Sequence, residues 1–94
     1  MRDHDPTESE RRAVEAFRQA VEHEFDAIRM HESAANRHDE IAAQHERTAL
    51  TAPDDLRDHL TELAERERER AAEARARAEA ARTRLREDGF DPDV

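Results

Sequence analysis

Histidine and acidic side chains recur at a fixed spacing between His31 and Ala49, and their types and spacing could support chemistry. The repeated unit is a histidine, an acid, two further residues and an alanine, and it returns every seven residues. Its histidines are His31, His38 and His45, and a looser copy begins at His23. Because imidazole and carboxylate groups bind both metal ions and protons, the repeat raises two possibilities, a metal site and a pH-responsive surface.

The spacing argues against a metal site built on this helix alone. Residues seven apart lie about 10.5 Å apart along a helix axis, too far to share one ion. The zincin motif needs a second histidine four residues after the first, where the repeat has alanine, and the Glu-x-x-His motif needs an acid three residues before each histidine. A metal ion would therefore need ligands from another helix, for example Glu67 opposite His38, or from a second chain. The candidate ligands are His31, His38, His45 and Glu67.

A simpler interpretation makes the histidines flank residues of a helical seam, half-buried and hydrogen-bonded to acids on a neighbouring helix. The chain carries a net charge of −9 at pH 7. Protonated histidines would reduce this self-repulsion, so we expect the folded chain to melt at a higher temperature near pH 6 than near pH 8.

The composition predicts an all-helical protein. Of the 94 residues 44% are charged, only one is Gly and three are Pro, while Ala, Glu and Arg, which favour helices, are abundant. A short chain with eighteen alanines builds only a thin core, so oligomerisation is the expected remedy. The absence of Cys excludes disulfides and thiolate chemistry.

Several function classes lack support in the sequence. The negative net charge argues against nucleic acid as a partner, because phosphate binding needs a basic face. The sequence contains no apolar run long enough to predict a membrane-spanning helix. We therefore expect a cytoplasmic protein with no membrane partner. We find no Gly-rich loop and no nucleophile beside a base, so we expect neither an enzyme nor a bound cofactor.

Helix signals divide the chain into two helices. Residues 1–5 form a polar tail, helix 1 spans about 6–50, the turn covers 51–53, helix 2 spans about 53–88, and 89–94 form a stop and an acidic tail. Asp5 with Pro6, or alternatively Thr7 with Glu10, caps helix 1. Pro53 breaks the helix and serves as the first residue of helix 2.

The end of helix 2 carries a specific stop signal. Gly89 occupies the left-handed position, and Phe90 after it packs on Leu85 in a Schellman motif. Because a short link joins two long helices, the sequence predicts an antiparallel two-helix hairpin with long, coiled-coil-like helices.

The apolar residues predict how the helices pack. The hairpin core is expected to contain Phe17, Val21, Phe25, Ile28, Leu56, Leu60, Leu63, Ala78, Ala81 and Leu85. In this register Val21, Phe25 and Ile28 face Leu85, Ala81 and Ala78 respectively. The Glu/Arg-rich helix 2 is otherwise expected to be a solvated face with pairs within the helix, such as Glu73 with Arg77.

Helix 1 has a second apolar side that the narrow stripe of helix 2 cannot cover. We expect this side to mediate self-association into a homodimer, forming a four-helix bundle. Its residues are Ala20, Ala27, Met30, Ala34 and Ile41. The sequence therefore predicts a non-enzymatic protein–protein interaction module that binds or regulates another, still unknown, protein. The alternative is a metal-binding or pH-sensing helical protein built on the histidine repeat.

Overall fold

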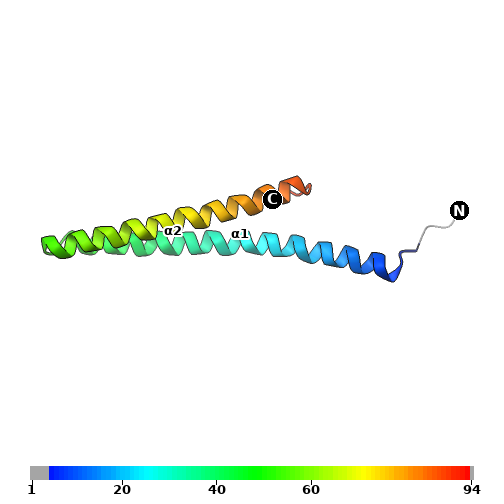
Figure 1. Cartoon of the computed structure of the whole chain (residues 1–94), viewed down its shortest axis with the longest axis horizontal. Coiled ribbons are helices and arrows are strands. Elements are labelled where there is room, and N and C mark those ends of the chain that lie inside the picture. The colour runs from blue at the N-terminus through cyan, green and yellow to red at the C-terminus, as the bar shows by residue number, and fades with distance from the viewer. Residues whose placement is uncertain (1–4, 94) are drawn as a thin grey trace.

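The computed structural model describes residues 5–93 and shows a two-helix hairpin. Helix α1 spans Glu8–Ala49 and helix α2 spans Asp54–Glu87, and the described residues contain no strand. The helices lie side by side in a rod of 81 × 20 × 15 Å (Figure 1). The predicted all-α hairpin is confirmed. Within residues 5–93, neither helix includes a stretch long and apolar enough to cross a membrane.

A capping box starts α1. The backbone N–H of Glu10 donates to Thr7 Oγ1 at 3.1 Å, and the backbone N–H of Thr7 donates to Glu10 Oε2 at 3.4 Å. The second of the two predicted caps is therefore the one formed, and the helix begins two residues later than position 6.

The turn is held by Arg57, a residue that the sequence did not single out. Its guanidinium donates to the carbonyl of Ala49 at 3.1 Å and to that of Ala52 at 2.9 Å. The carbonyl of Ala49 also accepts from the N–H of Ala52 at 3.3 Å. Arg57 thus adds donors at the end of α1 and in the turn, where the carbonyls lack their regular helical partners. Pro53 precedes α2 as its N-cap in an extended conformation, so the prediction that it is the first helical residue was wrong by one position.

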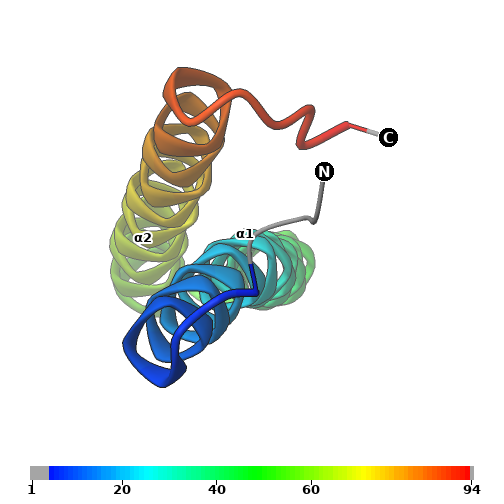
Figure 2. The same ribbon diagram turned by 90° about the vertical axis from the view of Figure 1, so that its right-hand side faces the viewer.

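The predicted stop signal of α2 is present in full. The N–H of Phe90 donates to the carbonyl of Leu85 at 2.9 Å, and the N–H of Gly89 donates to that of Arg86 at 3.0 Å. Gly89 has a φ of 89°. The side chain of Phe90 packs on the cluster that contains Leu85, which completes the Schellman motif. After α2 the chain turns towards the α1 side of the rod (Figure 2).

The core is a seam of small residues. Twelve hydrophobic residues are buried in the described chain and nine of them are alanine. In α1 the buried residues recur every seven positions, at Ile28, Ala35, Ala42 and Ala49. In α2 they are Leu60, Ala64, Ala71, Ala74, Ala78, Ala81 and Leu85. This period is that of a coiled coil, in which each side chain packs between residues from two turns of the facing helix.

Most of the predicted core lies in this seam. Ile28, Leu60, Ala78, Ala81 and Leu85 are buried, and Val21, Phe25 and Leu63 pack against them.

Two predicted core residues lie outside it. Phe17 is 53% exposed because α2 ends before reaching its level, and Leu56 is 45% exposed because it lies in the first turn of α2, before the seam begins at Leu60.

The register differs slightly from the predicted one. Ile28 shares its buried cluster with Ala81 and Leu85, which lie about one and two helical turns further along α2 than Ala78. Larger side chains gather in this cluster, whereas the middle cluster contains only alanines. The helices accordingly run close together near the turn and separate towards the end of α2 (Figures 1 and 2).

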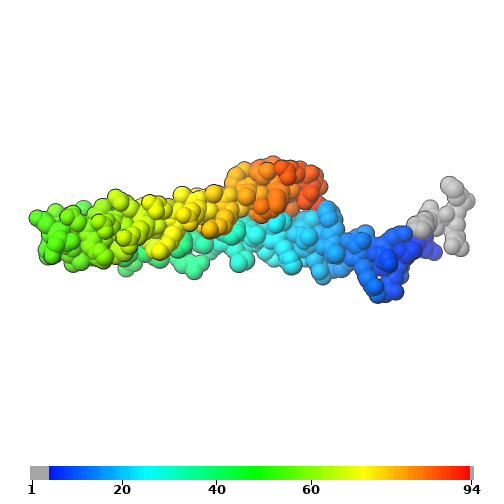
Figure 3. All heavy atoms as spheres, in the orientation of Figure 1, coloured from blue at the N-terminus to red at the C-terminus, as the bar shows by residue number. Residues whose placement is uncertain are grey.

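Helix α1 is longer than α2 and continues beyond it as a single helix (Figures 1 and 3). Every side chain from Glu8 to Ala20 is exposed, and we call these residues the overhang. Val14 is 69% exposed. Phe17 touches only the edge of the hairpin, where its ring centroid lies 6.0 Å from that of Phe90.

Replacing Gly89 by alanine tests the stop signal. A Cβ at this position meets no atom within 4 Å, so the cost comes from the left-handed backbone alone. We expect Gly89→Ala to lower the free energy of unfolding by about 1 kcal/mol. Urea titration measures the change. Gly89→Asn should recover part of the loss because asparagine tolerates this conformation, and an unchanged midpoint in both variants would contradict the motif's role.

Candidate interaction surface

The seven-residue repeat gives each of its residues a distinct place beside the seam. The repeat alanines Ala35, Ala42 and Ala49 are buried at its centre. The histidines His31, His38 and His45 lie beside them and are half-buried. The prediction that the histidines flank a helical seam therefore agrees with where the structure places them.

His38 forms the one histidine hydrogen bond across the seam among the described residues. Its Nδ1 lies 2.6 Å from Glu67 Oε2, and the side chains are 32% and 13% exposed. Because an ionised carboxylate only accepts hydrogen bonds, Nδ1 is the donor and Nε2 of a neutral His38 keeps its lone pair. Arg70 donates to the other oxygen of Glu67 at 2.8 Å. The His38 hydrogen bond, aided by the charge of Arg70, lowers the pKa of Glu67.

Of the four candidate metal ligands, the structure brings two into contact. His38 and Glu67 are in contact, while His31 and His45 lie one repeat away on either side. In the described part of the chain, no three His, Asp or Glu side chains converge in a way that could hold a metal ion. Ligands from a second chain would therefore be needed to complete a site.

Ion pairs close one flank of the seam. Three arginines of α2 spaced seven residues apart face the three repeat acids of α1. Arg68 donates to Asp39 at 3.0 Å and to Glu46 at 2.5 Å. Arg75 donates to the other oxygen of Asp39 at 2.5 Å. The third pair is Arg82 with Glu32.

These contacts change the electrostatics of both helices. The hydrogen bond from Arg75, together with that from Arg68, lowers the pKa of Asp39. Pairs within α2 are present as predicted, but at other residues: Arg70 pairs with Glu67 and Arg82 with Glu79, whereas in the described residues Glu73 and Arg77 do not pair with each other.

The other flank of the seam carries the histidines and, outside them, a row of apolar residues. Its polar contacts with α2 are His38 with Glu67 and Glu24 with Arg84. An acid of the repeat lies four residues after a buried position of α1, whereas a residue one before that position lies on the opposite side of the helix. Ala27, Ala34 and Ile41 occupy these preceding positions, and all three are half-buried. Ala20 continues the row into the overhang, where it is exposed, and Met30 beside the row is 69% exposed. The predicted self-association residues therefore share one side of α1.

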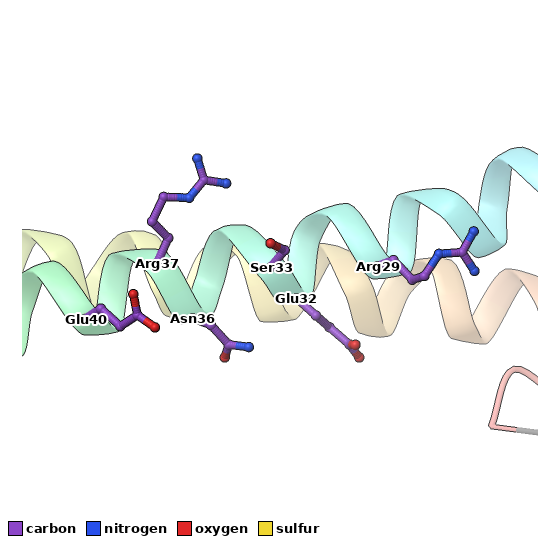
Figure 4. Close-up of a pocket in the computed structure, with 6 residues that line it drawn as sticks. All are labelled: Arg29, Glu32, Ser33, Asn36, Arg37 and Glu40. Carbon is purple, nitrogen blue, oxygen red and sulfur yellow. The ribbon is translucent and has the colours of Figure 1, made fainter.

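Open hollows, rather than an enclosed cavity, mark the surface of α1. Figure 4 shows one lined by Arg29, Glu32, Ser33, Asn36, Arg37 and Glu40. All six come from one helix, and Arg37 points away from Asn36 and Glu32. A second hollow of about 460 Å³ has Met30 and Ala34 among its lining residues, with Arg29 and Arg37 beside them. Such shallow surfaces suit contact with another protein better than enclosure of a small substrate.

Comparison of the chain with protein-family models, with curated proteins and with solved structures finds no match. The functional interpretation of this surface therefore rests on the residues themselves.

The sequence pattern did not place two exposed apolar residues of α1 on the self-association side. Phe17 was placed in the core and Val14 was not assigned to the self-association side, yet both are exposed on the overhang. The relative lengths of the helices were the available signal, because helix 2 was already expected to be shorter than helix 1.

Acid should weaken the hairpin through Asp39 and Glu67. Their lowered pKa values contribute stability above the ordinary values of 3.8 and 4.5, and this stability is lost as the pH falls through the folded-state values. We therefore expect thermal melts to show a falling midpoint between pH 5.5 and pH 3.

The double variant Asp39→Asn with Glu67→Gln should be less stable at pH 5.5 and should lose less on acidification. Glu62→Gln is the matched control, because the exposed Glu62 has no ion-pair partner in the described chain. An equal acid dependence in the wild type and the double variant would contradict this assignment.

Proposed function

We propose that this chain is a non-enzymatic protein–protein interaction module that self-associates through the apolar side of α1 and in that form binds another protein. The observation that carries the proposal is the difference between the two flanks of the seam. Arg68, Arg75 and Arg82 cover one flank with a continuous row of ion pairs. The other flank has the separate pairs His38–Glu67 and Glu24–Arg84, and outside them lies a row of apolar residues, Ala27, Ala34 and Ile41.

The thin core supports the same proposal. Burying alanine removes little apolar area from water, so a seam in which nine of the twelve buried hydrophobic residues are alanine contributes modest hydrophobic stabilisation. Large apolar side chains meanwhile remain exposed on α1, among them Val14, Phe17 and Met30. Covering them with a second copy would add the burial that a hairpin of this size lacks.

A charge placed at Met30 tests self-association without disturbing the hairpin. Met30 is 69% exposed and glutamate suits a helix as well as methionine does. We expect Met30→Glu to raise the dissociation constant of the dimer by about tenfold or more, because a charge is costly to bury at an interface. Sedimentation equilibrium at micromolar concentration measures this constant.

Leu56→Glu is the matched control. Leu56 is also a large exposed apolar residue, but it lies on α2 at the turn, away from the α1 surface. This variant should sediment like the wild type, and circular dichroism should show both variants fully helical. A wild-type chain that stays a folded monomer at these concentrations would refute the proposal.

A second candidate function, metal binding, is favoured by the contact between His38 and Glu67. A carboxylate that accepts from one ring nitrogen is the usual partner of a histidine that binds metal through the other. Titration with zinc should then give a dissociation constant well below that of a histidine tag, and His38→Gln should abolish it. Binding no tighter than such a tag would rule out this candidate.

A further inference from the structure

An apolar stripe winds along α1 from the overhang onto the side that α2 leaves open. Successive members are spaced by about one helical turn or two, so they follow one another along the helix surface. Val14 and Met30 are each 69% exposed and Phe17 is 53% exposed. The stripe consists of Val14, Phe17, Ala20, Ala27, Met30 and Ala34.

The charged side chains of this part of α1 pair with one another on the other side of the helix. Arg18 donates to Glu22 at 2.5 Å and also binds Glu15. Arg29 binds Asp26. At 100° per residue these side chains lie roughly opposite Ala20, Ala27 and Ala34. Glu24 differs, because it lies beside Ala20 and Ala27 on the face of the stripe. Its charge is paired with α2, since Nε of Arg84 donates to Oε2 of Glu24 at 2.8 Å.

The stripe is nearly symmetric about residue 24. Val14 lies ten residues before this point and Ala34 lies ten residues after it. Phe17 lies seven residues before this point and Met30 lies six residues after it. Ala20 lies four residues before it and Ala27 lies three residues after it. Two antiparallel copies related by a two-fold axis near residue 24 would set each residue against its counterpart. Such an isologous contact closes on itself.

We propose that the occupant of this stripe is a second copy of the chain, crossing α1 in antiparallel orientation with the two-fold axis near residue 24. This arrangement rests on the proposed self-association and specifies its geometry. The overhang of each copy covers the open side of the other, and Phe17 of one copy meets the hollow beside Met30 and Ala34 of the second copy. Contact between a methionine sulfur and an aromatic ring is favourable.

The stripe also continues an interface that the fold already uses. Val14 and Val21 lie at the seven-residue spacing of Ile28, so the seam pattern of α1 runs on beyond the end of α2. In the antiparallel pair the second copy takes over where α2 stops. Ile41 lies opposite Thr7 of the second copy and therefore only at the rim.

Cysteine cross-linking tests the arrangement, because the chain has no native cysteine. The variants are His23→Cys near the axis, Val14→Cys and Ala34→Cys. Under mild oxidation we expect His23→Cys to form a covalent dimer and the other two to remain uncrosslinked by themselves. An equimolar mixture of Val14→Cys and Ala34→Cys should cross-link, since a disulfide needs Cα atoms within about 7 Å.

Any different cross-linking pattern would overturn the arrangement and would indicate an alternative. Cross-linking of all three variants with themselves would show a parallel dimer, and cross-linking of Ala34→Cys alone would place the axis at Ala34. Sedimentation of the same variants under reducing conditions separates the two proposals. A dimer that gives neither expected cross-link contradicts this geometry only, whereas monomers throughout contradict self-association itself.

A pair of charge substitutions gives an independent measurement. Phe17→Glu should raise the dissociation constant of the dimer at least tenfold, and Ile41→Glu, at the rim of the contact, should raise it by a smaller factor than Phe17→Glu does. The opposite order would overturn the proposed axis. Both residues lie outside the buried core clusters, so circular dichroism should show the hairpin intact in each variant.

Discussion

Close packing of alanines along one seam is the constraint on which the rest of this structure depends. Ala35 shares a cluster with Ala71 and Ala74, and such small side chains allow two helix backbones to approach closely. The approach brings the flanking side chains within reach of the facing helix, so that Arg68 contacts both Asp39 and Glu46. The histidine–acid–alanine repeat is thus one structural unit. Its alanine sets the distance between the two helices, and at that distance its acid can pair with an arginine of α2.

The same constraint limits what the hairpin can achieve alone. Exposed ion pairs add little stability, and an alanine seam buries little apolar surface. His38 and Glu67 lie beside the seam, and a partly buried polar pair of this kind is better at favouring one register than at stabilising the fold. The remaining apolar residues lie on the open side and the overhang of α1. These residues form the surface through which we propose that the chain self-associates.

The antiparallel arrangement proposed for the second copy uses the difference in helix length. If α2 matched α1, it would cover Val14 and Phe17 and the hairpin would bury its own seam. Because α2 stops at a Schellman motif, the seam pattern of α1 continues without a facing helix. A short second helix thus converts an internal packing surface into an external one.

The sequence alone determined the local structure, because the signals for it lie within a few residues of one another. The capping residues Thr7 and Glu10, the break at Pro53 and the stop at Gly89 fix where the helices begin and end, and the seven-residue alanine period fixes the seam. The opposition of His38 and Glu67 also followed from the sequence, since a short turn leaves an antiparallel hairpin few registers.

Only the tertiary structure decided which residues are buried between the helices and which side chains pair across them, because both depend on the distance between the helices. It showed that Phe17 and Leu56 lie outside the core, because burial requires a facing residue at the same level. It paired Arg68 and Arg75 with acids of α1, while Arg70 pairs with Glu67 inside α2, because a long guanidinium side chain binds whichever carboxylates the packed backbones bring near. It also assigned Arg57 to the carbonyls of the turn, a contact that exists only once the chain has reversed direction.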